Sequence, residues 1–296
     1  MLAAIKRTVP YIRFKEWTKA VRRQANLSSY RGTQYCCPIC RTELRAFKPV
    51  WRSYWLSIQE HQCVRSPFAM ETFNVGAYSC PSCDAFDRER LTALYLEQAF
   101  VSLDPRARYR LIEFAPAHSL HRMIRRHAFI EYRSADLLNP DVQDRGVDLT
   151  DMPRYPDASV DVFLCSHVLE HIPDDRKAMR ELNRVLKPQG FGVLLVPLFP
   201  DVHETHEDPQ IETLEARWKY YGAGDHVRQY GKQDFVHRLE EAGFSVDQLD
   251  VAHFGTEAFR RAGIAENSVL YVVRKAGDVR PAMAERTRSA DMVAAG

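Results

Sequence analysis

The sequence lacks the features that would place it in a membrane, outside the cell or on a nucleic acid. No apolar run approaches the roughly 20 residues that a helix needs to span a bilayer. Charged residues interrupt the amino-terminal stretch where a secretory signal would need an unbroken apolar core. The net charge is only +2, so no broad electrostatic footprint for nucleic acid is expected. These absences predict a cytoplasmic protein with no transmembrane segment, and they argue against nucleic acid as a partner.

The chain has 7 cysteines, and their placement is informative. Four of the 7 cysteines form the pairs Cys37-Pro-Ile-Cys40 and Cys80-Pro-Ser-Cys83. In a reducing compartment such pairs indicate metal or redox chemistry rather than disulfides. Together they can supply four thiolates to one tetrahedral zinc ion, and a closed site of that kind would have a folding role. The long spacer between the pairs is tolerable because loop closure entropy grows slowly. The alternatives are two independent turns with buried thiols, or Cys36 in place of Cys37 as a ligand.

The composition changes along the chain. The amino-terminal segment is basic, with Phe14, Trp17 and Val21 at helical spacing. We expect this helix to pack on the main domain, and an anionic membrane surface is the alternative. The predicted regions are a basic amphipathic segment at 1–30, a zinc-binding cysteine module at 31–85, a main domain at 86–275 and a disordered tail at 276–296.

The main domain alternates between strand-like and helix-like segments. Such alternation predicts an α/β fold with a mostly parallel sheet and helices on both faces. Ligands bind such sheets at the carboxyl ends of the strands. The expected strands are 109–114, 131–135, 146–149, 160–165, 191–197, 244–251 and 268–274, and the expected helices are 120–127, 172–188 and 233–242.

The run from Val147 to Pro197 carries a family resemblance. It has a short acidic loop, a strand, a VLEH turn, a helix ending in RVLKP and an apolar strand, in that order. In this it resembles the class I S-adenosylmethionine-dependent methyltransferases of the methyltransferase-11 type. The resemblance implies a Rossmann-like sheet of seven strands, S-adenosylmethionine as the cofactor and methyl transfer as the reaction. Here a zinc-ribbon-like module would precede that fold.

The resemblance also implies where the cofactor binds. The loop after the first strand takes the place of the family's glycine-rich loop, although alanines stand where glycines are usual. Asp136 would accept hydrogen bonds from the ribose hydroxyls, or else cap a turn. Asp148 would accept a hydrogen bond from the adenine amino group, or else belong to a turn. The cofactor-binding residues so implied are Glu113, Ala115, Pro116, Ala117, Asp136, Asp148, Leu149, Ser166 and His167.

Candidate catalytic groups follow from hydrogen-bonding density and from a resemblance to the DHVRxYG stretch of a methyltransferase subgroup. We expect His226, or else His171, to remove a proton from an alcohol acceptor. Asp225, Arg228 and Tyr230 would contact the substrate. The alternatives are a structural loop histidine at position 226 and a packing role for His171. The upstream stretch with His203 and His206 is interpreted as a solvated acidic loop rather than as a metal site.

The sequence is compatible with three functions. The first is methylation of a small molecule or glycan, such as a surface polysaccharide, at an oxygen atom. The second is RNA methylation, in which the zinc module and the basic amino terminus would contact phosphates. The third is a non-catalytic module that binds S-adenosylmethionine, which the glycine-poor loop keeps open.

Overall fold

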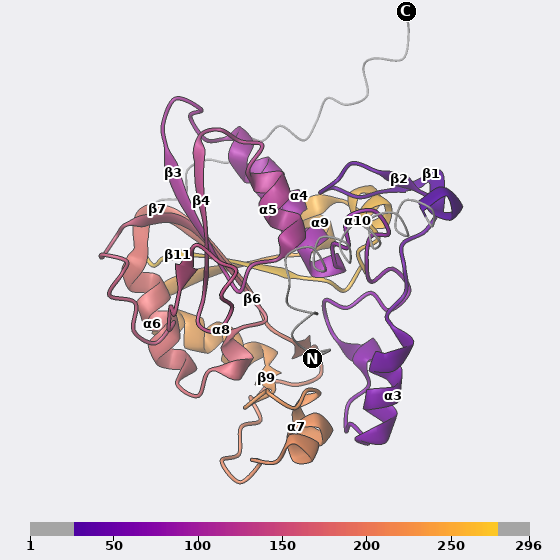
Figure 1. Ribbon diagram of the computed structural model, residues 1–296. Helices are drawn as coiled ribbons and strands as arrows, with labels where there is room; N and C mark the ends of the chain where they lie inside the picture. The colour runs from indigo at the N-terminus through magenta and orange to yellow at the C-terminus, as the bar shows by residue number, and fades with distance from the viewer. Residues whose placement is uncertain (1–26, 278–296) are drawn as a thin grey trace, which may run out of the picture.

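The computed structural model describes residues 27–277, which are built around one seven-stranded sheet (Figure 1). The strand order is β10-β11-β7-β6-β3-β4-β5. Strand β11 is antiparallel to both of its neighbours, and the other pairs are parallel. The strands are β3 (Tyr109–Phe114), β4 (Ile130–Asp136), β5 (Asp144–Arg145), β6 (Val160–Ser166), β7 (Leu186–Leu195), β10 (Phe244–Leu249) and β11 (Leu270–Lys275).

Helices cover both faces of this sheet, because each presents an apolar stripe that must be buried. In Figure 1, α4 (Asp87–Val101) and α5 (His118–Ile124) lie on one side, and α6 (Asp175–Val185) and α8 (Lys232–Glu241) lie on the other. The central strands β6 and β7 are almost wholly buried, as continuous apolar runs require. The predicted Rossmann-like fold with a mostly parallel seven-stranded sheet is therefore confirmed.

Several predicted boundaries were wrong. The third strand of the main domain is Asp144–Arg145 rather than 146–149, because Gly146 takes a positive φ of 67° and turns the chain. The helix predicted from residue 172 begins at Asp175, and the Asp174 side chain accepts a hydrogen bond from the Lys177 amide at its start. Strand β7 begins at Leu186, earlier than predicted, directly after that helix.

The cysteine module packs against the main domain without a break in the core. Phe47 of the module lies so close to Gly263 that a methyl group there would overlap its ring. The buried Arg90 of α4 donates to the carbonyls of Tyr78 and Ala85 on one side and to that of Ala262 on the other. The module elements are η1 (Ser28–Tyr30), β1 (Arg31–Cys36), β2 (Glu43–Leu44), α3 (Arg52–Glu60) and η2 (Pro67–Ala69).

The segment between the two cysteine pairs reaches an insertion that follows β7. The Val64 amide donates to the carbonyl of Lys219 at 2.8 Å, and the Cys63 thiol lies 3.0 Å from the Trp218 carbonyl oxygen. The His61 ring stacks on Trp218. Two chain segments that are far apart in sequence therefore meet beside the sheet, at the bottom of Figure 1 where α3 and α7 lie. The remaining elements are η3 (Leu169–His171), β8 (Leu198–Phe199), α7 (Leu214–Tyr221), β9 (Tyr230–Gly231), α9 (Val251–Phe254) and α10 (Thr256–Ala262).

Among residues 27–277, no helix has the length and apolar character needed to cross a bilayer. The helix expected around Phe14, Trp17 and Val21 lies outside the described residues, as does nearly all of the tail predicted to be disordered.

Candidate functional site

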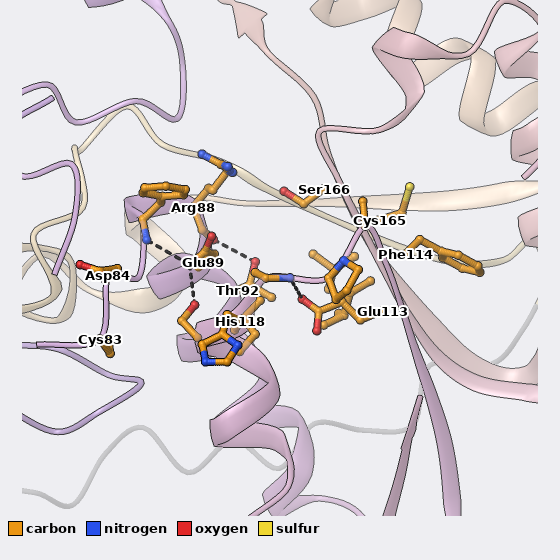
Figure 2. Close-up of a pocket in the computed structure, with 18 residues that line it drawn as sticks. Cys83, Asp84, Arg88, Glu89, Thr92, Glu113, Phe114, His118, Cys165 and Ser166 are labelled. Atoms are coloured by element: carbon orange, nitrogen blue, oxygen red, sulfur yellow. Dashed lines mark hydrogen bonds between the residues drawn. The ribbon is translucent and has the colours of Figure 1, made fainter. Parts of the chain in front are cut away.

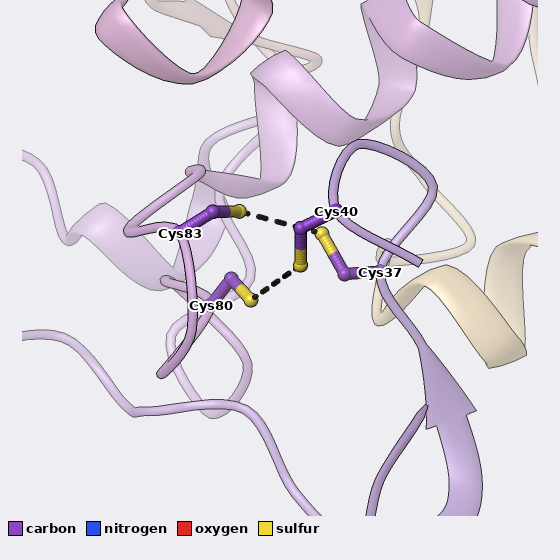
Figure 3. A group of neighbouring side chains, drawn as sticks. All are labelled: Cys37, Cys40, Cys80 and Cys83. Atoms are coloured by element: carbon purple, nitrogen blue, oxygen red, sulfur yellow. Dashed lines mark hydrogen bonds between the residues drawn. The ribbon is translucent and has the colours of Figure 1, made fainter. Parts of the chain in front are cut away.

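The four paired cysteines converge on one point (Figure 3). The sulfur atoms of Cys37 and Cys83 are 3.7 Å apart, and those of Cys40 and Cys80 are 3.8 Å apart. A tetrahedron of sulfurs about 2.3 Å from a central zinc ion has edges of about 3.8 Å. Hydrogen bonding from Cys37 lowers the pKa of Cys40 and Cys80, whereas hydrogen bonding among the sulfurs and burial raise the pKa of Cys37 and Cys83, so a bound cation would have to ionise the second pair. The donor set therefore fits a structural zinc ion.

The two cysteine turns have the same backbone design. The amide of Arg41 donates to the Cys37 carbonyl at 2.8 Å, and the amide of Asp84 donates to the Cys80 carbonyl at 2.9 Å. Arg41 and Asp84 both have positive φ angles, 61° and 60°. Left-handed backbone is unfavourable for residues other than glycine by about 1–2 kcal/mol. Holding it at both matched positions indicates that the pairs are built to bring their sulfurs together.

A cavity of about 390 Å³ lies at the carboxyl ends of β3 and β6, and we call it the strand-tip cavity (Figure 2). Cys83 and Asp84 stand on one side, while Phe114 and Cys165 stand on the other. The position agrees with the rule that parallel sheets bind ligands at their strand tips. The polar or charged residues along its wall are Asp84, Arg88, Glu89, Thr92, Glu113, His118, Ser119 and Ser166.

The loop after β3 has a left-handed backbone conformation at the position where glycine is usual. Ala115 has a φ of 49°, and its amide donates to the Ala135 carbonyl on β4. Alanine has the smallest side chain that can replace glycine at such a position. The buried Glu113 carboxylate holds the loop by accepting from the Ala117 amide at 2.8 Å and from the Tyr132 hydroxyl at 2.7 Å. Glu113 is therefore a positioning group for the loop, and burial raises its pKa to about 7.

The cysteine module connects directly to this loop. Glu89, in the first turn of α4, accepts from the Phe86 amide at 3.1 Å and from the Ser119 hydroxyl at 2.5 Å. Phe86 follows the second cysteine turn, and Ser119 follows the loop after β3. Figure 2 shows Glu89 between the two segments. The geometry of the strand-tip cavity thus depends on both regions of the chain.

The implied ribose and adenine residues are not among those that line the strand-tip cavity. Asp136 ends β4, and its Oδ1 accepts from the amides of Leu138 and Asn139. Asp148 Oδ1 similarly accepts from the Thr150 amide and hydroxyl. Both carboxylates therefore cap turns, as the alternative interpretation predicted, while each keeps a second oxygen for other partners.

A second cavity of about 200 Å³ adjoins the first, and Arg88 lines both. We call it the aromatic cavity. One wall comes from the spacer between the cysteine pairs and the other from the insertion around α7. Its aromatic side chains are Tyr54, Phe73, Tyr78, Phe199, Trp218, Tyr220 and Tyr221. From the sequence that spacer was interpreted as a tolerated loop, whereas in the structure it forms one wall of a cavity.

Polar groups enter the aromatic cavity from the VLEH turn and from the DHVR segment. His167, with a φ of 57°, and His226 both line it, as does Gln229. Burial lowers the pKa of His226 to about 4 and that of His167 well below its usual value, so both imidazoles are neutral near pH 7. The buried Gln229 Nε2 has no hydrogen-bond partner within residues 27–277. A ligand in this cavity would therefore contact the unprotonated nitrogens of the two imidazoles and the unpaired Gln229 amide, which can donate a hydrogen bond.

Glu170 lies behind these histidines and was not predicted from the sequence. Its side chain is only 1% exposed, and neither carboxylate oxygen has a hydrogen-bond partner among the described residues. Oε1 lies 3.4 Å from His167 Nδ1 and 3.9 Å from His226 Nε2. Burial raises the pKa of Glu170 to about 8. A glutamate in a helix-like VLEH stretch carries no sequence signal of such burial.

His171 and Asp225 stand near the aromatic cavity without lining it. The Nδ1 atom of His171 is 3.3 Å from the Asp225 carbonyl oxygen and 3.5 Å from Asp225 Oδ2. The two histidine rings, His171 and His226, meet edge to face with centroids 4.8 Å apart. The structure thus brings the two candidate bases together in one cluster.

Arg228 and Tyr230, which were expected to contact substrate, both have buried side chains whose polar groups bond to the protein itself. Arg228 donates to the carbonyls of Leu169 and Pro173 at 3.0 and 2.7 Å, and also to Glu207. The Tyr230 hydroxyl donates to the buried carboxylate of Asp175, the first residue of α6. Both therefore fasten the VLEH turn in place.

The acidic loop upstream, with His203, Glu204, His206 and Glu207, is largely exposed, in line with the interpretation as a solvated loop. Glu207 accepts from Arg238 at 2.8 Å and from Arg228 at 2.7 Å. Burial alone would raise the pKa of Glu207, but these two guanidinium groups lower it to about 2. The Glu207 carboxylate is about 40% exposed, so it pairs with two buried arginines from the surface of the molecule.

Comparison with known proteins gives this arrangement a family. The family profile described as a methyltransferase domain (Methyltransf_11) matches residues 119–194, from α5 to the end of β7. Residues 119–194, which contain strands β4 to β6 and nearly all of β7, are thus similar to the methyltransferase domain of this family. The family implies S-adenosylmethionine as the methyl donor, in agreement with the resemblance noted in the sequence.

Individual relatives match about a third of the chain. Over 102 residues the chain is 33% identical to the thiol S-methyltransferase TMT1B of Rattus norvegicus, covering 33% of this chain and 38% of that protein. Over 95 residues it is 34% identical to the methyltransferase YcgJ of Bacillus subtilis (strain 168), covering 32% and 33% of the two. The crystal structure of YcgJ matches with a TM-score of 0.39 at 17% identity, covering 62% of this chain and 97% of that one. The chain thus spans about a third of the length of the curated relatives it matches.

The residues present fit the methyl donor that the family implies. The strand-tip cavity has a volume within the usual range for small-molecule sites, roughly 300–1,000 Å³. The Ser166 hydroxyl on its wall is buried and has no partner within the described part of the chain. A buried hydroxyl of this kind is unfavourable unless a ligand or water satisfies it. The left-handed Ala115 also leaves the loop backbone open to close approach.

Proposed function

We propose that this protein transfers a methyl group from S-adenosylmethionine to an oxygen atom of a small molecule or glycan. The observation that carries the proposal is that Arg88 lines both the strand-tip cavity and the aromatic cavity. A donor in one and an acceptor in the other would lie next to each other. Holding two reactants in that way supplies a large part of the rate of such reactions.

The chain's own residues divide the work. We assign the loop of Ala115 to Ala117 and the Ser166 hydroxyl to the donor, with Asp136 and Asp148 using their second oxygens for its ribose and adenine. The donor, when bound, supplies an activated methyl group, and its transfer to an acceptor hydroxyl leaves a thioether and releases the hydroxyl proton. That proton passes to an imidazole in the wall of the aromatic cavity, either His226 or His167.

The aromatic cavity supports a small acceptor. Its volume of about 200 Å³ holds one ring with its substituents, since a cavity of about 150 Å³ binds benzene. Flat aromatic walls stack on the faces of sugar or aromatic rings, and the Gln229 amide offers a donor to a hydroxyl group. We place the enzyme in the cytoplasm, because none of the seven cysteines is in a disulfide and four of them converge on one metal site, as a reducing compartment allows.

The test is incubation with methyl-labelled donor and fractionated small-molecule and glycan extracts, followed by tracing the label. We expect label in one acceptor class with the wild-type protein. Asp136→Asn should weaken donor binding by about 10–100-fold, the value of a hydrogen bond to a charged group. Asp141→Asn on the same exposed loop is the matched control and should bind normally.

Three outcomes would contradict parts of the proposal. Donor binding without transfer to any fraction would indicate a non-catalytic module. Label that appears only in RNA would assign the acceptor to a different class. Unchanged binding by Asp136→Asn would show that this carboxylate is wrongly assigned to the donor.

A further inference from the structure

We propose that Glu170, His171 and His226 form a second metal site, which binds a divalent first-row transition metal such as Zn²⁺ beside the aromatic cavity. This site is separate from the four cysteines. It deepens the proposed function by adding a cation to the acceptor side, but metal binding can be measured without methyl transfer.

The three side chains are already gathered. One ligand atom from each lies within 4.8 Å of the others. Glu170 and His171 come from η3, and His226 comes from the segment before β9. The Val227 amide donates to the Glu170 carbonyl at 2.9 Å, which ties the two segments together next to the ligands. Two imidazoles and one carboxylate are a common ligand set for zinc with an open position.

The buried carboxylate is the second and independent observation. Both oxygens of Glu170 lack a hydrogen-bond partner among residues 27–277, although the side chain is 1% exposed. Leaving a buried polar group unsatisfied is unfavourable by about 1–3 kcal/mol, and by more for a charged group. A bound cation would provide the missing partner for an oxygen that lies 3.9 Å from His226 Nε2.

Each histidine of the proposed site is held by a contact at its Nδ1 atom, as metal-bound histidines commonly are. His226 Nδ1 lies 3.2 Å from the Tyr221 carbonyl oxygen, so this nitrogen carries the hydrogen and Nε2 presents its lone pair toward Glu170. His171 Nδ1 contacts Asp225 in the same manner. Such outer contacts fix the tautomer and the ring orientation of metal-bound histidines.

Charge near the site is mixed. Asp225 adds a second carboxylate close to His171, and positive charge on Arg88 and Arg228 reaches Glu170. Arg228 is already paired with Glu207 at 2.7 Å, which reduces its opposition to a cation. The vacant coordination position of a bound cation would face the aromatic cavity, because His226 lines that cavity. It would polarise an acceptor hydroxyl there and leave His167 as the imidazole that takes the proton.

The experiment adds Zn²⁺ or Co²⁺ to the full-length protein as isolated, with its cysteine site filled, and measures bound metal by mass spectrometry after desalting. We expect one further ion per chain in the wild type. Glu170→Gln and His226→Gln should each lose that ion or bind it at least about 100-fold more weakly, since losing even an outer partner lowers metal affinity 10–100-fold. His237→Ala is the matched control, because this exposed histidine pairs with Glu241 away from the cluster.

The readout separates the two metal sites and the two proposals. Cobalt bound by imidazole and carboxylate lacks the intense thiolate absorption that cobalt bound by cysteine shows. Binding of the methyl donor by each variant reports that the fold is intact. A wild-type protein that takes up no ion beyond the cysteine site, or a Glu170→Gln variant with wild-type uptake, would overturn the inference, whatever the outcome of the methylation assay.

Discussion

The buried carboxylate of Glu113 makes the stability of the protein depend on pH in a definite direction. Burial raises its pKa from 4.5 to about 7, despite opposing hydrogen bonds from Tyr132 and from the Ala117 amide. Folding therefore favours the protonated form. The resulting stability is present in full below pH 4.5, is lost as the pH rises through 7, and is constant above that.

The magnitude follows from the pKa of Glu113 in the folded and unfolded chain. A tenfold change in a protonation equilibrium corresponds to about 1.36 kcal/mol. Between pH 5.5 and pH 8 this group should therefore lower the free energy of unfolding by about 2 kcal/mol. Glu113→Gln removes the titration but keeps the shape. Its loss of one acceptor for Tyr132 or Ala117 is a fixed penalty that does not vary with pH.

The assay is urea unfolding of the wild type and of Glu113→Gln at both pH values, with zinc present throughout. We expect the variant to gain about 2 kcal/mol relative to the wild type on going from pH 5.5 to pH 8. Glu131→Gln, a half-exposed position on the next strand, serves as the control and should show no such change. A difference between wild type and Glu113→Gln that is the same at both pH values would refute the reasoning.

Three further predictions concern the loop, the cysteine cluster and the contact between the two regions. Ala115→Gly should change the free energy of unfolding by less than about 1 kcal/mol in calorimetry, because relief of left-handed strain is offset by a freer unfolded chain. Stripping zinc with a chelator should lower the melting temperature and weaken donor binding in titration calorimetry, since Cys83 and Asp84 line the strand-tip cavity; full affinity in the metal-free protein would contradict this. Gly263→Ala should destabilise the protein by about 2–4 kcal/mol in urea unfolding, because its φ is 64° and the new methyl group would overlap Phe47.

The sequence predicted the strands well where apolar runs were long and uninterrupted. The first strand of the main domain was predicted at its observed bounds, Tyr109–Phe114, and the fourth differs by a single residue. Short elements were harder, because the two-residue strand Asp144–Arg145 owes its position to the turn at Gly146 and to pairing with β4. Local pattern does not encode that pairing.

The candidate site was predicted in part. The resemblance assigned Ser166, His167 and the Ala115 loop to the cofactor; Ser166 and the loop line the strand-tip cavity, whereas His167 lines the aromatic cavity. Arg228 was assigned to substrate because dense polar groups in a loop suggest binding. In the structure the same polarity satisfies buried carbonyls, a distinction that requires knowing what packs against the loop.

The sequence by itself determined the order of apolar strands and helices, and hence the sheet. It also determined the four sulfur ligands, because residue spacing alone matches each cysteine pair to a metal-binding turn. Only the tertiary structure decided which polar groups lose contact with water. The Glu170 carboxyl became isolated, and the spacer between the cysteine pairs became a cavity wall, since segments distant in the chain closed over them. Burial depends on those distant partners, so no local pattern could reveal it.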